Sequence, residues 1–145
     1  MDEVNKFVSQ FTNKKINGVF KHGRKYFLID EEQRLLSEKI NRDLFSIGIF
    51  LGEKKNDFKP TPALIDVISE ISQKKVFISQ KAEWLFLCGR DVFEDSITKK
   101  YSDEKIVLVQ NEKDENLGYG VFIKKGKEKI LKNLLDKGFY LRREN

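Results

Sequence analysis

Cysteine and histidine are almost missing from this sequence. Its 145 residues include one cysteine, Cys88, and one histidine, His22. A single cysteine cannot form an intramolecular disulfide, and this pair falls short of the three or four nitrogen and sulfur ligands of a zinc site. We therefore expect no metal. Because Cys88 ends the apolar run 85–88, we expect its thiol to be buried rather than reactive.

Long hydrophobic stretches are missing as well. No apolar run approaches the roughly 20 residues that a membrane helix needs. The first four residues, Met-Asp-Glu-Val, are acidic and lack the apolar segment of a signal peptide. The sequence therefore predicts an intracellular, soluble protein with no membrane partner.

The sequence motifs of common catalytic sites are not present. There is no P-loop, no dinucleotide-binding glycine pattern, no nucleophile elbow and no C-x-x-C. A serine–histidine–aspartate triad would depend on His22, which lies in a predicted hairpin turn. Carboxylate pairs such as Glu94/Asp95 lie in polar segments that would not raise a pKa. We expect a binding module, with no enzymatic activity and no cofactor.

What the sequence does contain is a normal apolar content and an uneven distribution of charge. Hydrophobic residues make up 39% and aromatic residues 12%, enough for a folded core. Residues 118–145 hold eight basic and three acidic side chains, an excess that equals the net charge of +5 of the whole chain. Such asymmetry indicates a polyanionic partner, although a solubilising tail stays open.

Apolar spacing divides the chain into two parts. In the first part it predicts helices over 4–11 and 31–41, a hairpin over 16–30 that turns at 22–24, and a strand over 45–52. A polar turn over 53–57 follows, and then a helix that Thr61 caps and Pro62 begins. Residues 1–73 are thus predicted to form a small α/β domain with an antiparallel sheet.

The second part is predicted to form a mixed barrel over residues 74–145. Strands are expected at 75–78, 106–109 and 119–123, and Gly89 is expected to end a short apolar helix over 82–88. Gly118 and Gly120 bracket Tyr119 at the start of a strand, which is typical of a bulge or close packing. Residues 127–135 have a local pattern compatible with a helix.

Several of these segments together resemble a PUA domain, the module named after pseudouridine synthases and archaeosine transglycosylases. Residues 75–92 resemble its first strand and helix, 117–121 its glycine-bracketed strand, and 136–144 its closing D-x-G-x-Y-L-R-R segment. The resemblance implies RNA binding, and it implies a strand rather than a helix at 129–133. The fold class expected for the whole chain is α+β.

Residues 41–48 and 58–66 are similar to the first domain of ribosome-biogenesis factors of the Nip-seven type (nuclear import protein seven). That resemblance implies a role in large-subunit maturation and pre-rRNA processing. The implied partners are rRNA or pre-rRNA and ribosome-assembly proteins, which would dock on residues 1–73. Brevity and a Lys/Glu bias favour a cytoplasmic archaeal member, whereas a eukaryotic member would be nucleolar.

The predicted RNA-binding residues are all basic: Lys81, Arg90, Lys132, Lys137, Arg142 and Arg143. The two terminal arginines match the closing pair of the family, and their planar guanidinium groups suit bidentate contacts with phosphate. The lysines at 132 and 137 would extend this edge. The residues at 81 and 90, before and after the short helix, would face it across a groove.

Three aromatic residues near these cations, Tyr119, Phe139 and Tyr140, are expected to pack in the core rather than stack on bases. Two other functions stay open. One is a protein-interaction adaptor that docks through its charge-balanced first half. The other is an accessory RNA-binding subunit of an RNA-modification enzyme whose catalytic chain is separate.

Overall fold

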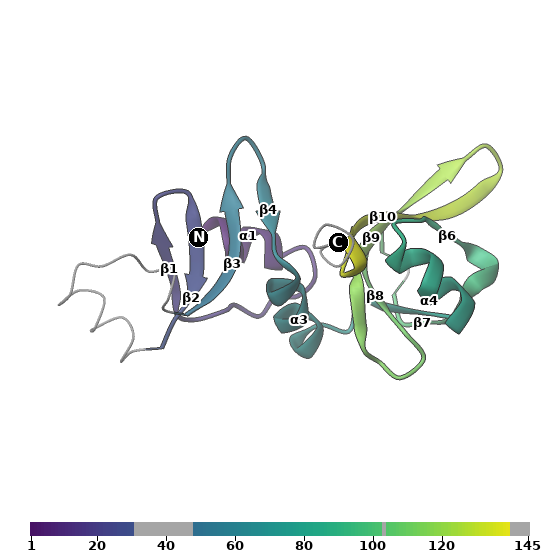
Figure 1. The fold of residues 1–145 in the computed structure, drawn as a ribbon, viewed down its shortest axis with the longest axis horizontal. Coiled ribbons are helices and arrows are strands. Elements are labelled where there is room, and N and C mark those ends of the chain that lie inside the picture. Colours follow the sequence, from purple (N-terminus) through teal and green to yellow (C-terminus); the bar gives the residue numbers. More distant parts are fainter. Residues whose placement is uncertain (31–47, 103, 140–145) are drawn as a thin grey trace. The chain divides into compact units, whose positions relative to one another are not determined.

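The computed structural model describes residues 1–30, 48–102 and 104–139 (Figure 1). The chain divides into two compact units, Met1–Val67 and Ile68–Asn145. The helix predicted at 31–41 and the first part of the strand predicted at 45–52 lie outside the described residues. Within the described ranges, no helix has the length and apolar character needed to cross a membrane.

The first unit contains an antiparallel sheet of four strands in the order β1-β2-β3-β4. The strands are β1 Val19–His22, β2 Lys25–Leu28, β3 Ile49–Lys54 and β4 Phe58–Pro60. The predicted hairpin is confirmed, and its turn contains Gly23 at a φ of +62°. Glycine adopts this left-handed conformation without the steric cost that other residues meet.

The polar turn predicted at 53–57 is wrong at its start. Strand β3 continues to Lys54, which pairs with Phe58 on β4. The ring of Phe58 lies 5.7 Å from that of Phe7 and 6.0 Å from that of Tyr26. These aromatic contacts hold Phe58 on the sheet. Because Lys54 pairs with Phe58, β3 extends to Lys54 although residues 53–57 are polar.

Helix α1, Glu3–Val8, packs on this sheet and confirms the first predicted helix. Asp2 caps it by accepting a hydrogen bond from the backbone nitrogen of Asn5 at 2.7 Å. The buried side chain of Asn5 also bonds both backbone groups of Ile16. These bonds fix the loop that leads from the helix to β1.

Helix α3, Pro62–Ile71, also begins as predicted. The hydroxyl of Thr61 accepts a hydrogen bond from the backbone nitrogen of Leu64 at 3.3 Å. Its buried residues are Leu64, Ile65 and Ile68. The division between the two compact units falls inside this helix.

The second unit contains a six-stranded mixed sheet in the order β6-β10-β9-β8-β5-β7. Its strands are β5 Lys75–Ile78, β6 Val92–Phe93, β7 Ile97–Lys100, β8 Ile106–Gln110, β9 Asn116–Lys125 and β10 Glu128–Asp136. Only β5 and β8 pair in parallel among the described strands. Helix α4, Gln80–Leu87, follows β5, and the short 3-10 helix η2, Glu94–Ser96, precedes β7. An antiparallel sheet followed by a curled half-barrel confirms the predicted α+β class.

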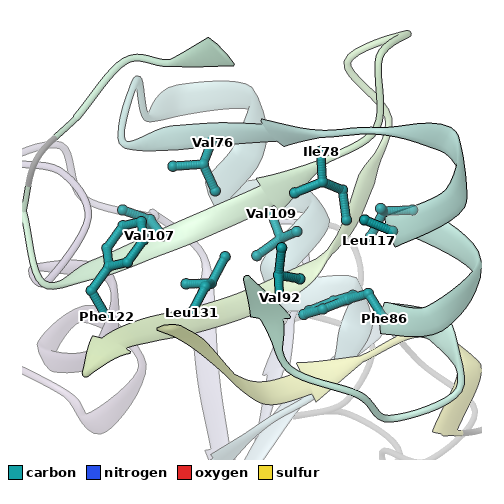
Figure 2. Packing of buried hydrophobic residues seen from close by; sticks show 10 residues of the cluster. Val76, Ile78, Phe86, Val92, Val107, Val109, Leu117, Phe122 and Leu131 are labelled. Atoms are coloured by element: carbon teal, nitrogen blue, oxygen red, sulfur yellow. The ribbon is translucent and has the colours of Figure 1, made fainter. Parts of the chain in front are cut away.

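The core of the second unit lies between the curled sheet and α4. Val76, Val107 and Phe122 reach it from the strands, and Phe86 reaches it from the helix (Figure 2). Strand β10 confirms the strand expected near 129–133, because it pairs with β9 along most of its length. Burial of Leu131 in this core outweighs the local helical pattern of residues 127–135.

Gly118 confirms the expectation of close packing at the start of β9. Its φ is +145°, and a Cβ atom there would overlap the backbone carbonyl oxygen of Leu135 on β10. The pairing register of β9 and β10 shifts between Asn133 and Leu135. The glycine therefore allows the two strands to approach at an irregular point in the sheet.

Candidate nucleic-acid interface

Helix α4 places side chains on opposite sides of its axis. The hydroxyl of Ser79 caps its first turn by accepting a hydrogen bond from the backbone nitrogen of Ala82 at 3.2 Å. Gly89 follows its last turn at a φ of +90°. Ala82 and Phe86 are buried in the core, whereas Lys81 and Trp84 are exposed. One face of the helix is thus structural and the other is open to a ligand.

The end of α4 is tied to the irregular part of β10 through Asn133. The side-chain nitrogen of Asn133 donates to the carbonyl oxygens of Phe86 at 3.0 Å and Arg90 at 3.4 Å. The backbone nitrogen of Asn133 donates to Asp91 at 2.8 Å. These bonds fix the path of the loop that carries the exposed Arg90 side chain.

The segment after β10 reaches the same end of the helix. A Cβ atom on Gly138 would overlap the carbonyl oxygen of Leu87, so the two backbones are in direct contact. The backbone nitrogen of Lys137 donates to the carbonyl oxygen of Leu117 at 3.0 Å. Lys137, which is half-buried, is therefore held near the C-terminal end of α4, as is Arg90.

The other predicted site residues are more widely distributed. Lys132 precedes Asn133 on β10 and pairs with Val121, so its side chain lies on the face of β10 opposite to that of Asn133. Lys81 lies in the first turn of α4, not before the helix as predicted. Arg142 and Arg143 lie outside the described residues. The structure thus brings together two of the six, Arg90 and Lys137.

A second group of cations, which the prediction of individual residues missed, lies at the turn between β9 and β10. Lys124, Lys125 and Lys127 are all exposed there. The hairpin that carries them extends away from the rest of the unit (Figure 1). The signal for these residues was available in the sequence, because they contribute to the basic excess of residues 118–145.

Nine exposed cations of the second unit have no ion pair among the residues that the structure describes: Lys81, Arg90, Lys99, Lys105, Lys113, Lys124, Lys125, Lys127 and Lys132. Two other lysines of the unit do have acidic partners, since Lys74 pairs with Glu104 and Lys75 with Asp114. Cations without an acidic neighbour retain their attraction for an external anion.

Acidic side chains gather at the opposite end of α4, in the turn between β8 and β9. Glu112 accepts a hydrogen bond from the backbone nitrogen of Gln80 at 3.2 Å. Asn111 donates to Glu83 at 3.2 Å and to Glu115 at 2.9 Å. Arg90 and Lys137 lie at the other end of the helix, where the carboxylates of Asp91 and Asp136 also lie.

Exposure also corrects two predictions about single residues. Cys88, expected in the core, is exposed at the end of α4. Phe139, also expected in the core, is 42% exposed. Tyr119 is buried as predicted, and burial raises its pKa to about 12. Tyr140 lies outside the described residues.

The C-terminal part of the chain matches a known family. Residues 74–145 match the family model described as the UPF0113 PUA domain. Over this segment the chain is similar to the PUA domain of that family. The PUA resemblance seen in the sequence is thus confirmed, and PUA domains are in general RNA-binding modules.

Two archaeal proteins described as UPF0113 proteins are similar to the chain. The one from Archaeoglobus fulgidus is 32% identical over 107 residues, which cover 67% of this chain and 62% of the relative. The one from Aeropyrum pernix is 33% identical over 103 residues, which cover 68% of this chain and 58% of the relative. The chain thus spans about three fifths of the length of these curated relatives.

The fold also resembles that of a solved archaeal protein. The structure of a conserved PUA domain protein from Thermoplasma acidophilum aligns with a TM-score of 0.51 at 17% identity. The alignment covers 92% of this chain and 88% of that protein. At this identity the likeness supports the fold alone.

Proposed function

We propose that this protein binds RNA through its PUA domain and does so without catalysis of its own. The observation that carries the proposal is the set of nine exposed cations of the second unit that lack an ion pair among the described residues. A sugar–phosphate backbone is the polyanion that such a surface fits, because each neutralised phosphate releases condensed counterions.

The cations offer two contact regions on the PUA domain. One is the end of α4, where Asn133 fixes the loop of Arg90. The other is the β9–β10 turn with Lys124, Lys125 and Lys127. The lysine and arginine side chains of both regions suit phosphate contacts, which make the affinity dependent on salt.

The test is the salt dependence of RNA binding by the full chain. Fluorescence anisotropy with a labelled RNA oligonucleotide gives the slope of log affinity against log salt. The triple variant Lys124→Ala/Lys125→Ala/Lys127→Ala should flatten that slope by about two to three units, since each lost phosphate contact removes roughly 0.7 to 0.9. Arg90→Ala should flatten it by about one unit.

A matched control comes from the first unit. Lys14, Lys15 and Lys55 are also exposed and form no ion pair within the described ranges. Their triple alanine variant loses the same charge and should leave the slope unchanged. Equal flattening by both triple variants would indicate nonspecific attraction, and no measurable RNA binding by the full chain would overturn the proposal.

We further propose that the bound RNA is rRNA or its precursor and that the protein acts with ribosome-assembly proteins in the cytoplasm. The support is the resemblance of residues 41–48 and 58–66 to factors of the Nip-seven type. In-cell crosslinking of the tagged full chain should then enrich precursor rRNA fragments. Enrichment of tRNA in their place would contradict the ribosomal role while leaving RNA binding intact.

A further inference from the structure

The single tryptophan of the chain is exposed on α4. Trp84 is 68% exposed, although it is the only tryptophan among 145 residues. Tryptophan has a large apolar surface and is highly buried on average in folded proteins. Packing of the PUA domain therefore does not explain why a tryptophan occupies this position. Its exposure indicates contact with a ligand.

Helix geometry explains why the core cannot absorb Trp84. Two residues along an α-helix correspond to a rotation of about 200°. Trp84 lies two residues after Ala82 and two before Phe86, both of which are buried. Figure 2 shows Phe86 pointing into the core. The indole of Trp84 therefore projects from the opposite side of the helix, away from the sheet.

The charge around Trp84 fits an anionic ligand. Lys81 lies one turn earlier on the same face, is exposed, and has no ion pair in the described part of the chain. Cys88, one turn later on the same face, is also exposed. The acid nearest in sequence, Glu83, accepts a hydrogen bond from Asn111 and so faces the β8–β9 turn.

Charged side chains lie at both ends of α4. Glu112 lies at the N-terminal end of α4, where it accepts a hydrogen bond from Gln80. Arg90 and Lys137 lie at the C-terminal end. Of these two cations, Arg90 is the exposed one, and it has no ion pair in the described part of the chain, so it can bind a phosphate of a strand that passes Trp84.

We propose that Trp84 stacks on an unpaired base of single-stranded RNA, and that Arg90 binds a phosphate of the same strand. This inference rests on the proposed function and names its substrate class. An exposed indole provides a sequence-tolerant stacking surface. The bases of a continuous duplex are stacked on each other and do not offer a free face to it.

Because Trp84 is the only tryptophan, its fluorescence reports on this contact alone. The full chain is titrated with a uridine oligonucleotide, an adenosine oligonucleotide and a blunt RNA duplex, while anisotropy of a labelled RNA measures binding independently. Both single strands should quench the emission at saturation. The duplex should bind with little quenching, because only the phosphate contacts remain.

Variants separate stacking from charge. Trp84→Ala should weaken single-strand binding by roughly 5- to 150-fold, the range expected for loss of one stacked base. Its salt slope should stay that of the wild type, because no phosphate contact is lost. Trp84→Phe should retain most of the affinity, since it keeps an aromatic face.

The matched control is Phe93→Ala, because Phe93 is 57% exposed on the same unit but lies on β6. It should leave single-strand affinity unchanged. Saturated single-strand binding without quenching of Trp84 would overturn the stacking proposal and favour a protein contact for this indole. Unchanged affinity of Trp84→Ala would overturn it too, whereas failure of every RNA to bind would overturn the proposed function itself.

Discussion

The side-chain amide of Asn133 donates a hydrogen bond to the carbonyl oxygen of Phe86 at 3.0 Å, across 47 residues of sequence. The same nitrogen lies 3.2 Å from a carboxylate oxygen of Asp136 and 3.4 Å from the carbonyl oxygen of Arg90. One side chain therefore joins the end of α4, the loop after it and the irregular part of β10. These are the elements that position the proposed RNA contacts at this end of the helix.

We predict that Asn133→Ala lowers both stability and RNA affinity. The variant removes several partly buried hydrogen bonds, which should lower the free energy of unfolding by about 1–3 kcal/mol. Release of the Arg90 loop should also weaken RNA binding. Urea unfolding and anisotropy measure the two effects. Asn13→Ala, at an exposed position in the first unit, is the control and should change neither quantity.

A second prediction concerns the close approach of β9 and β10 at Gly118. Gly118→Ala places a methyl group against the carbonyl oxygen of Leu135. Gly126→Ala is the matched control, because Gly126 also has a positive φ, +67°, but a Cβ atom there meets no atom within 4 Å. Both variants carry backbone strain, which is larger at the φ of +145° of Gly118 than in the left-handed helical region of Gly126, and only the first adds overlap. Gly118→Ala should therefore cost about 1–3 kcal/mol more in urea unfolding, and equal costs would contradict this account.

Much of the PUA domain was predictable because its longer elements have strong local patterns. The run Val76-Phe77-Ile78 predicted β5, and Gly89 predicted the end of α4. The positions of Gly118 and Gly120 on either side of Tyr119 indicated the close strand packing that the structure shows. In each case the conformational preference of the residue type agrees with the conformation that the residue adopts in the fold.

The short strands were not predictable for the opposite reason. Strand β6 contains two residues, and β7 has the polar sequence Ile-Thr-Lys-Lys. Neither shows an alternation of apolar and polar side chains long enough to recognise. Each exists because a neighbouring strand offers hydrogen bonds, β10 for the first and β5 for the second.

The candidate site was predictable in its charge and not in its geometry. The basic excess at the end of the chain includes the lysines that the structure exposes in the β9–β10 turn. It did not indicate that Lys132 and Asn133 point to opposite faces, because that depends on strand register. Nor did the apolar composition of α4 reveal Trp84, because composition does not say which face a short helix buries.

A third prediction follows from the ion pair of Lys75 and Asp114, whose charged atoms lie 3.2 Å apart. A hydrogen bond from Gln110 is the main cause of a lowered pKa at Asp114, and Lys75 adds to it against the opposing effect of burial. Since the folded-state pKa is below the unfolded one, the carboxylate stabilises the fold above about pH 4. That contribution is lost as the pH falls through the folded-state pKa.

Asp114→Asn should remove this acid-dependent contribution to the free energy of unfolding. Asparagine tolerates the φ of +61° at this position, so the backbone turn should survive. Because the Asp114 side chain is 56% exposed, solvent screening should keep the loss at pH 7 below about 1 kcal/mol. Urea unfolding should show the difference from wild type shrinking between about pH 5 and pH 2. Asp57→Asn, at an exposed turn, should show no such convergence.

The final prediction concerns alkaline stability and Tyr119. Its side chain is 9% exposed, and burial raises its pKa to about 12, whereas the phenol of an unfolded chain titrates near pH 10. Between these values the unfolded state loses a proton that the folded state keeps. The free energy of unfolding should therefore fall as the pH rises from about 10 to about 12, at up to about 1.4 kcal/mol per pH unit.

Tyr119→Phe should lack this alkaline loss of stability, because phenylalanine carries no ionisable proton. Urea unfolding of wild type and variant at several pH values between about 8 and 11 gives the difference in slope directly and cancels the titration of other groups. Tyr101→Phe is the control, since Tyr101 is 50% exposed and should keep the alkaline slope of the wild type. If Tyr119→Phe destabilises the protein equally at every pH, then burial of the phenol does not oppose its ionisation, and the β9–β10 region must open to solvent before Tyr119 titrates.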